Sequence, residues 1–163
     1  MHPGAFEFVG RYATTDEISV IEIGSRDING SVKPHFPNAI WTGLDLYSGE
    51  GVDYAMDALD YEPADRVDLV VCCEVMEHSA QWTELIDQAW EWLLPKGRII
   101  ITCAGPGRDP HSAIDGGALH PDEHYANISQ QEMREALEFA TFQDIEVSGN
   151  EYWKDTYAIA VKP

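Results

Sequence analysis

Basic residues are scarce in this sequence. Its 163 residues include 10 Lys and Arg against 29 Asp and Glu, which gives a formal net charge of −19 at pH 7. Proteins that bind a phosphate backbone need clusters of Lys and Arg, and this sequence has none. We therefore expect no nucleic-acid partner. We interpret the charge as a solvated acidic surface, with attraction of cationic ligands as the alternative.

Long apolar runs are also missing. No run approaches the roughly 20 residues that a bilayer-spanning helix requires. The N-terminus lacks the basic segment and apolar core of a secretory signal. Hydrophobic residues nevertheless make up 44% of the chain, so a packed core is expected. We predict a single domain over residues 1–163, without a membrane partner, located in the cytoplasm and present as a monomer or homodimer.

Cysteine is rare as well, since the chain has only Cys72, Cys73 and Cys103. No C-x-x-C pair is present, and two of the three cysteines lie side by side in one apolar run. We interpret them as buried, reduced thiols. A catalytic or metal-binding cysteine is the alternative.

The most informative stretch that is present covers residues 20–30, which read Val-Ile-Glu-Ile-Gly-Ser-Arg-Asp-Ile-Asn-Gly. An apolar strand ends there in Glu22 and Gly24, and a glycine leaves room for a bound group to approach the backbone. A second apolar run, residues 40–44, ends in Asp45. An acid about 20 residues after a glycine turn is how open α/β sheets hold a ribose. The pattern predicts an adenosine-containing cofactor.

The remaining apolar patterns predict strands that alternate with helices. Strands are expected at 18–23, 40–46, 52–55, 67–73, 98–103, 142–147 and 152–161, and helices at 82–94 and 129–140, with a short helix start at 31–36 and a covering helix within 1–17. The last two strands are expected to pair around a turn at 148–150. This order predicts an α/β, Rossmann-like, doubly wound fold with a mostly parallel seven-stranded sheet and an antiparallel last strand pair.

One segment does not fit this alternation. Residues 105–128 contain four Gly, three Pro and three His without any periodicity. Unstructured stretches of this length in a compact domain are usually functional or disordered. Because the segment follows the carboxyl end of a strand, which is the ligand side of such sheets, we predict that it is an active-site lid.

The order of these motifs resembles the class I S-adenosylmethionine-dependent methyltransferases of the small-molecule type, over about residues 18–161. The resemblance is carried by Glu22-Ile23-Gly24, Asp45, Met56-Asp57-Ala58, the segment 73–78 (Cys-Glu-Val-Met-Glu-His) and the segment 93–98. It implies that S-adenosylmethionine is the cofactor. The cofactor contacts that it implies are Glu22, Gly24, Ser25, Arg26, Gly30, Asp45, Leu46, Tyr47, Met56, Asp57, Ala58, Glu74 and Val75.

The first motif departs from the family's usual E-x-G-x-G-x-G. Arg26 and Ile28 replace the later glycines, and Gly30 comes six positions after Gly24. Arg26 could pair with the carboxylate of the cofactor, since a guanidinium matches a carboxylate bidentately, or it could face solvent. Both readings stay open.

Three residues are predicted to act in catalysis: His78, His111 and Tyr125. His78 could serve as a general base, and the alternative is a histidine held only by packing. Histidines and acids crowd the predicted lid, but their spacing matches no compact zinc pattern, so we predict no metal site.

The leading hypothesis is therefore a methyltransferase that transfers a methyl group from S-adenosylmethionine to an unidentified small-molecule acceptor. The alternative is a catalytically inactive module with the same fold that binds a ligand or serves as a scaffold. A nicotinamide-dependent oxidoreductase would need G-x-G-x-x-G after the first strand, and that motif is absent.

Overall fold

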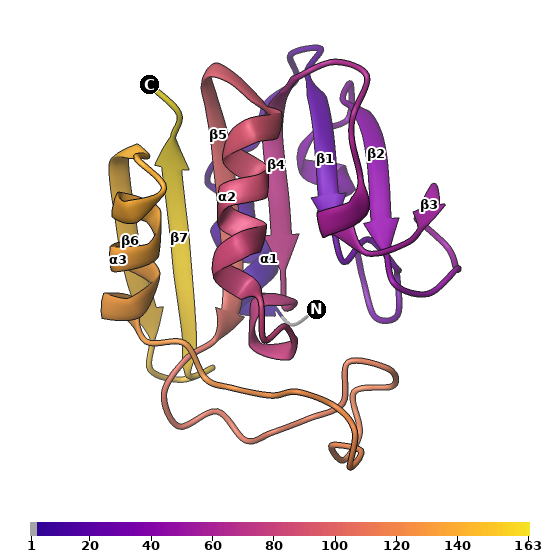
Figure 1. Cartoon of the computed structure of the whole chain (residues 1–163), viewed down its shortest axis with the longest axis vertical. Coiled ribbons are helices and arrows are strands. Elements are labelled where there is room, and N and C mark those ends of the chain that lie inside the picture. The colour runs from indigo at the N-terminus through magenta and orange to yellow at the C-terminus, as the bar shows by residue number, and fades with distance from the viewer. Residues whose placement is uncertain (1–2) are drawn as a thin grey trace.

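The chain folds around one seven-stranded sheet with helices on both faces (Figure 1). The computed structural model describes residues 3–163. Its strands are β1 (Ser19–Ile23), β2 (Ile40–Asp45), β3 (Tyr54–Ala55), β4 (Val67–Cys73), β5 (Leu93–Ala104), β6 (Gln143–Asn150) and β7 (Asp155–Val161). Its helices are α1 (Pro3–Gly10), α2 (Trp82–Trp92) and α3 (Gln130–Phe139), and short 3-10 turns are η1 (Lys33–His35), η2 (Ala58–Asp60) and η3 (Met76–His78).

The strand order is β3-β2-β1-β4-β5-β7-β6. The first five strands in this order are parallel, and β7 lies antiparallel between β5 and β6. The sequence jumps from β1 outward to β2 and then back to β4, which makes the β1–β4 junction the switch point where ligands bind in open α/β sheets. The predicted fold class is confirmed.

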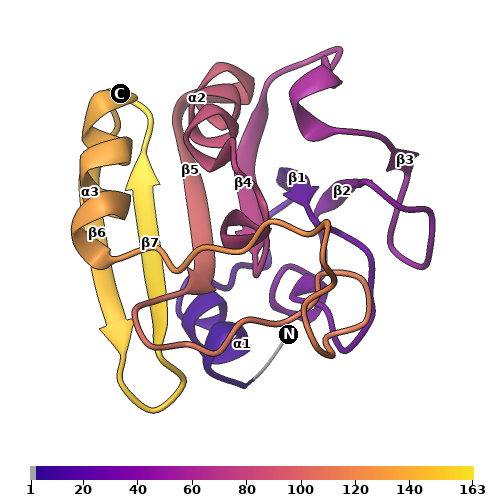
Figure 2. The same ribbon diagram turned by 60° about the horizontal axis from the view of Figure 1, so that its bottom comes forward.

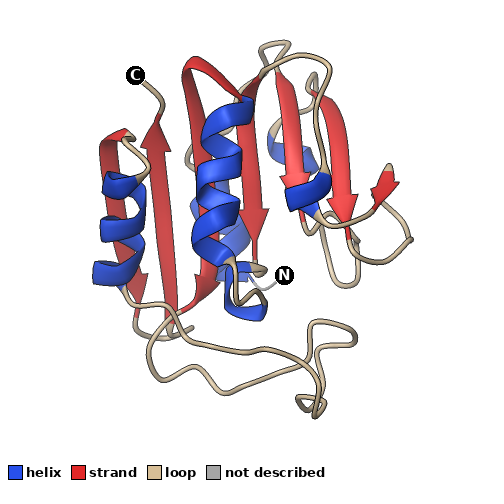
Figure 3. Ribbon diagram, viewed as in Figure 1, coloured by secondary structure: helices blue, strands red, loops and turns tan. Residues whose placement is uncertain are grey.

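The core has two layers, one on each face of the sheet. Val20 belongs to the same apolar cluster as Phe8 of α1, whereas the next residue, Ile21, belongs to the cluster that contains Ile86 of α2 and Leu137 of α3. Successive strand residues point to opposite faces. The parallel strands therefore need continuous apolar runs to be buried on both sides. Figure 3 shows α2 and α3 over one face of the sheet.

Helical cover is thin beside β1 and β2. Between β1 and β2 the only helical turn is η1, which lies within the short helix start predicted at 31–36, and between β3 and β4 it is η2. The covering helix predicted within 1–17 is confirmed as α1, with residues 1–2 outside the described part. No helix of the described chain combines the length and apolarity needed to cross a bilayer.

The predicted turn at 148–150 is wrong. Gly149 and Asn150 belong to β6, where they pair with Thr156 and Asp155, and the connection follows at 151–154. The side-chain oxygen of Asn150 accepts hydrogen bonds from the backbone N–H groups of Tyr152 and Trp153, at 3.0 and 3.1 Å. Asn residues favour turns through such bonds to the backbone that follows, so the chain turns after Asn150 and not before it.

The end of α2 also differs from prediction. The helix ends at Trp92, and β5 begins at Leu93. The ammonium group of Lys162 donates to the carbonyl oxygens of Trp90 and Leu93 at 2.7 and 2.8 Å. These bonds satisfy carbonyls that have lost their helical partners, and they let the chain enter the sheet before the Pro95-Lys96-Gly97 segment. The predicted strand at 98–103 is therefore only the central part of β5, and β3 is limited to Tyr54–Ala55.

Residues 105–129 contain neither helix nor strand. Figure 2 shows this loop running from β5 across the carboxyl ends of the strands towards β1 and β2, and then returning to α3. Its path is held partly by Glu123, whose carboxylate accepts from the Ser112 hydroxyl at 3.0 Å and from the backbone N–H groups of Ala113 and His120 at 2.9 Å. Serving as a lid stays a prediction, but the loop lies where a lid would act.

Candidate functional site

A cavity of about 250 Å³ opens at the carboxyl ends of β1, β2 and β4. Every cofactor contact implied by the sequence resemblance lines this cavity, and so does His78. The lining residues that sequence reasoning did not select are Ile23, Ile28, Asn29, Ser31, Leu44, Cys73, Ser79, Leu85 and Ala113. They are mostly neighbours of the selected residues on the same loops, so a motif search could find them only as flanking positions.

The turn after β1 depends on Gly24. Its φ angle is +76°, a conformation that L side chains rarely adopt. A Cβ at this position would lie 2.1 Å from Cγ2 of Val75, a residue that follows β4. The glycine therefore lets the β1 loop pass directly against the β4 loop, which closes the floor of the cavity.

Asp45 is the last residue of β2, and its carboxylate is held in place by the backbone. One oxygen accepts the N–H of Tyr47 at 2.9 Å, and the other accepts the N–H of Arg26 at 3.3 Å. A carboxylate can accept about four hydrogen bonds. Both oxygens therefore keep capacity for hydroxyl groups of a ligand, in an orientation fixed before the ligand arrives.

Glu22 and Ser25 place unsatisfied polar atoms in the cavity wall. Glu22 is 6% exposed, and neither its Oε2 nor the hydroxyl of Ser25 has a hydrogen-bond partner among the described residues. Burial raises the pKa of Glu22 to about 7, an effect that Lys33 opposes. Buried polar groups normally have partners, so these two atoms indicate that a polar ligand belongs here.

Arg26 lines the cavity and also contacts the loop, so both readings of its role toward the cofactor stay predictions. Its guanidinium donates to the carbonyl oxygen of Ile114 in the loop at 2.9 Å and lies 5.2 Å from the ring centre of Tyr47. Its Nε is buried without a hydrogen-bond partner in the described structure. Arg26 thus connects the β1 turn to the predicted lid and still has one free donor.

The segment after β3 lies beside β2. The backbone N–H of Met56 donates to the carbonyl oxygen of Asp45 at 2.8 Å. Asp57 caps η2 by accepting the N–H of Leu59 at 2.9 Å. Across the cavity mouth, Leu46 is 65% exposed and Tyr47 is 47% exposed. These two side chains and the carboxylate of Asp57 line the same cavity, a combination that suits a flat ring with an amino edge.

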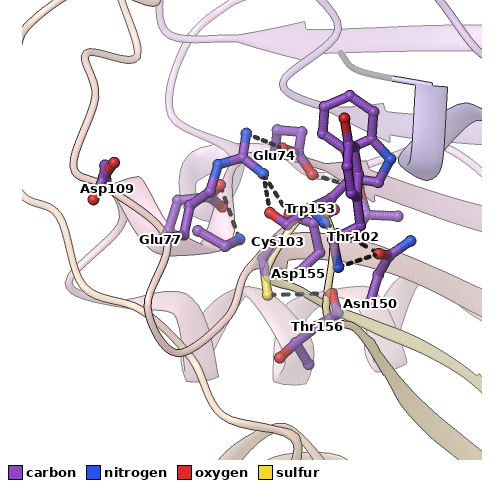
Figure 4. Close-up of polar contacts among 12 residues, drawn as sticks. Glu74, Glu77, Thr102, Cys103, Asp109, Asn150, Trp153, Asp155 and Thr156 are labelled. Atoms are coloured by element: carbon purple, nitrogen blue, oxygen red, sulfur yellow. Dashed lines mark hydrogen bonds and ion pairs between the residues drawn. The ribbon is translucent and has the colours of Figure 1, made fainter.

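Glu74 belongs to a polar network behind the cavity. It has a positive φ of 58° and accepts the Thr102 hydroxyl at 2.9 Å. Its other oxygen lies 3.9 Å from the guanidinium of Arg108, which also pairs with the buried Asp155. Figure 4 shows Glu74, Thr102 and Asp155 close to one another, with Glu77 beside them. The network joins the ends of β4, β5 and β7 to the start of the loop.

The three predicted catalytic residues lie together. The ring centres of His78 and His111 are 5.0 Å apart, and that of Tyr125 lies 5.4 and 5.2 Å from them. His78 lines the cavity, whereas the other two, which do not line it, come from the loop and pack behind His78. Burial lowers the pKa of His78 to about 4, with His111 adding to the effect. His78 is therefore neutral at pH 7 but a weak base.

Glu77 is the residue that sequence reasoning missed in this group. It is fully buried, and burial, with the charge of Glu74 adding, raises the pKa of its carboxyl to about 8. It offers an oxygen to a cluster with His78 and His111 in which all donor atoms lie within 4.8 Å of one another. Its place next to His78 in the segment 73–78 was visible in the sequence, but the approach of His111 depends on the path of the loop.

Comparison with known proteins gives one family. A family model described as "Methyltransferase domain" matches residues 5–147 of this chain. A comparison with curated proteins found no match.

Solved structures share the fold over nearly the whole chain at low sequence identity. A 1,6-didemethyltoxoflavin-N1-methyltransferase from Burkholderia thailandensis, with 1,6-didemethyltoxoflavin and S-adenosylhomocysteine bound, superposes with a TM-score of 0.73 at 16% identity, covering 98% of this chain and 77% of that one. A Haemonchus contortus phosphoethanolamine N-methyltransferase 2 in complex with S-adenosyl-L-methionine gives 0.72 at 17% identity, with coverage of 98% and 52%. A magnesium protoporphyrin IX methyltransferase from Synechocystis PCC 6803 with bound S-adenosylmethionine gives 0.68 at 14% identity, with coverage of 98% and 79%. This chain thus spans about half of the second protein and about three quarters of the other two.

Proposed function

The chain belongs to the methyltransferase domain family, and from that premise we propose that it transfers the methyl group of S-adenosylmethionine to a small-molecule acceptor. The resemblance seen in the sequence is confirmed by the family match over residues 5–147. The fold match covers nearly the whole chain. Each of the three solved methyltransferases was crystallised with S-adenosylmethionine or its demethylated product, which supports the same cofactor here.

One observation carries this proposal: the implied cofactor contacts, spread over residues 22–75, all converge on a single cavity. Those residues come from loops that follow four different strands, so chance assembly is a poor explanation. The cavity also contains the unpartnered Glu22 and Ser25, which fit a ligand with polar groups at one end.

Different lining residues would bind different parts of the cofactor. Asp45 would accept the two ribose hydroxyls, since both of its oxygens are oriented by backbone N–H groups. Leu46 and Tyr47 would cover the adenine ring, and Asp57 would accept from its amino group. Glu22, Ser25 and the free Nε of Arg26 would meet the amino acid end, where an ammonium and a carboxylate need an acid and two donors.

The cofactor supplies a methyl group that is already activated by its sulfonium charge. The chain therefore has to position an acceptor in line and exclude water. His78 faces the cavity next to Val75 and Ser79, on the side where the loop 105–129 passes. We place the acceptor there, with the loop as the lid that closes over it.

The acceptor is proposed to be a small molecule. Two of the solved relatives are named for small substrates, a toxoflavin precursor and phosphoethanolamine. The net charge of −19 disfavours nucleic acid. We also propose a cytoplasmic location, which is supported by three cysteines that are all free and at least partly buried, and a monomer or homodimer, to be tested by light scattering.

Calorimetric titration tests the proposal. We expect S-adenosylmethionine and S-adenosylhomocysteine to bind at one site per chain, and NAD not to bind. Formation of S-adenosylhomocysteine in the presence of candidate acceptors then tests turnover. Absence of binding to either cofactor form would overturn the proposal and favour the scaffold alternative, with the glycine-poor turn at 25–30 as the cause.

A further inference from the structure

Beside the cofactor cavity, three metal-ligand side chains from two distant segments point at one another. Glu77 and His78 belong to η3, and His111 belongs to the loop. Each offers one donor atom, and these atoms lie within 4.8 Å of one another. We propose that Glu77, His78 and His111 bind a divalent transition-metal ion, with zinc as the reference case.

Glu77 is prepared as a ligand. One of its carboxylate oxygens accepts the backbone N–H of Ala104 at 3.1 Å, which fixes the side chain. The other oxygen, Oε2, is buried and has no hydrogen-bond partner in the described part of the chain. A buried carboxylate without a partner is costly, and a bound cation would remove that cost.

His111 is oriented as metal-binding histidines usually are. Its Nδ1 lies 3.2 Å from the carbonyl oxygen of Asp109. A carbonyl can only accept, so Nδ1 carries the hydrogen and Nε2 keeps its lone pair. Histidine ligands commonly donate the second ring N–H to a backbone carbonyl in this way. The hydroxyl of Tyr125 donates to the same carbonyl at 3.3 Å, so its ring packs against the cluster while its oxygen is directed to Asp109.

His78 completes the set. Its Nδ1 is buried and has no hydrogen-bond partner within residues 3–163. Glu74 and Glu123 act on His78 in the sense that favours a cation, whereas His111 and His124 act in the opposite sense, and Arg108 opposes a cation near Glu77. Glu77 and His78 each have a buried polar atom without a partner among the described residues, and each brings a donor atom within 4.8 Å of the other, which indicates a missing shared ligand.

Two imidazoles and one carboxylate suit zinc in an open site, with a further position for water or substrate. Bonds of about 2.1 Å at tetrahedral angles put ligand atoms about 3.4 Å apart. The donors would therefore need to approach by roughly 1 Å, which the loop that carries His111 can supply. The backbone bond from Ala126 N–H to the Glu77 carbonyl, 2.8 Å, holds the returning loop against η3.

The site also defines the acceptor, and this part rests on the proposed function. Because His78 lines the cofactor cavity, the open position of the ion would face the methyl group. An acceptor hydroxyl bound there would give its proton to solvent at neutral pH, as metal-bound oxygens do. A lone pair of that oxygen would form the new O–C bond to the methyl group while the C–S bond of the cofactor breaks and S-adenosylhomocysteine leaves. The acceptor class would therefore be an oxygen nucleophile, such as a phenol or an enol.

Titration of the metal-free protein with Co²⁺, followed by visible absorption, tests the site. We expect one Co²⁺ per chain with the intense bands of a four- or five-coordinate ion, and displacement by Zn²⁺. His111→Ala and Glu77→Gln should each weaken binding at least about 100-fold, because even loss of an outer partner costs 10- to 100-fold. The control is His120→Ala, which removes an exposed histidine of the same loop and should bind Co²⁺ as the wild type does.

Added acetohydroxamate, a chelator with two oxygens, should change the Co²⁺ spectrum of the wild type if a coordination position is open. The proposal would be overturned by the weak absorption bands of an octahedral Co²⁺ ion. It would also be overturned if His111→Ala bound Co²⁺ as tightly as the wild type. His111 is a half-buried loop residue, so its variant is informative even if Glu77→Gln folds poorly.

The two proposals can fail separately. Calorimetry with S-adenosylmethionine is repeated with and without a metal chelator. Metal binding without cofactor binding would refute the proposed function and leave the metal site standing. Cofactor binding without metal binding would refute the metal site and leave the proposed function standing.

Discussion

Two neighbouring parts of the carboxyl edge of this sheet are built in different ways. The cofactor side consists of residues at or after the ends of β1, β2, β3 and β4, and its acids Asp45 and Asp57 are held by nearby backbone N–H groups. The lid side is the cluster of Glu77, His78 and His111, with Tyr125, and it exists only because a long loop returns to η3. The first part is encoded locally and the second by tertiary structure.

This difference affects how each part should respond to change. On the cofactor side, ends of strands in a rigid sheet position the groups, so a single substitution should remove one contact and leave the others. On the lid side, two of four residues belong to a loop without helix or strand. Loss of one contact there should affect the acceptor end of the reaction without reaching the cofactor.

The largest effect is expected at Gly24. Gly24→Ala places a Cβ 2.1 Å from Val75 Cγ2 and forces a side chain into φ +76°. The strain and the clash together should lower the free energy of unfolding by about 3 kcal/mol or more, measured by urea denaturation. Gly30→Ala is the matched control, since its φ is +119° but no atom lies within 4 Å, so it should lose only the strain. Equal losses in the two variants would refute the close approach of the β1 and β4 loops.

The next effect is a pH dependence at Glu22. The unfolded chain loses this proton near its ordinary pKa of 4.5, whereas burial keeps the folded pKa at about 7. Below pH 4.5 Glu22 is protonated in both states, so its burial carries no charge penalty. As the pH rises from 4.5 towards 7, only the unfolded chain loses the proton, and the free energy of unfolding therefore falls. Glu22→Gln should match the wild type at pH 4 and exceed its stability by about 2–3 kcal/mol at pH 8, without cofactor. Glu62→Gln, at an exposed position, is the control, and a parallel pH profile for Glu22→Gln would contradict the buried, unpaired state.

Asp45 tests the cofactor side directly. Asp45→Ala should weaken S-adenosylmethionine binding by about 1.5–3 kcal/mol, the scale of hydrogen bonds to a charged group, while the fold is retained. Calorimetry measures the change, with Asp87→Ala on the exposed side of α2 as control. If Asp45→Ala binds as tightly as the wild type, Asp45 does not hold the ribose.

The smallest effect on cofactor affinity is expected from the lid side. His78→Ala should change S-adenosylmethionine binding by less than about threefold, which is under 1 kcal/mol, yet lower turnover strongly. If affinity falls as far as in Asp45→Ala, the two parts are one unit and the comparison fails. If turnover is unaffected, His78 neither acts as a base nor holds the acceptor.

Most of the fold could be predicted because each element carries its own signal. The buried runs of β1 and β4, the apolar stripe of α2 and the capping box at Ser129 and Glu132 are local patterns. The error at the end of α2 has a long-range cause, because the partner of the last helical carbonyls is Lys162, about 70 residues further along the chain. The error at the final turn has a local cause, because the side chain of Asn150 bonds to the backbone that follows it.

The site shows the same division. The grouping of residues 22–75 around one cavity could be predicted because a strand end and a turn occupy the same few positions in any sheet of this kind. The role of Arg26 could not, since its partner is the carbonyl of Ile114 in a distant loop. The approach of His111 to Glu77 was likewise hidden, because the spacing of histidines along a loop does not show where the loop returns.

The structure of this chain with S-adenosylhomocysteine bound would test the central claim most directly. The account predicts the ribose hydroxyls on Asp45, the adenine ring over Leu46 and Tyr47, and the sulfur directed towards His78, with the lid-side cluster free of cofactor contacts. A cofactor bound away from the ends of β1 and β2, or one whose amino acid end contacts Glu77 and His111, would contradict it.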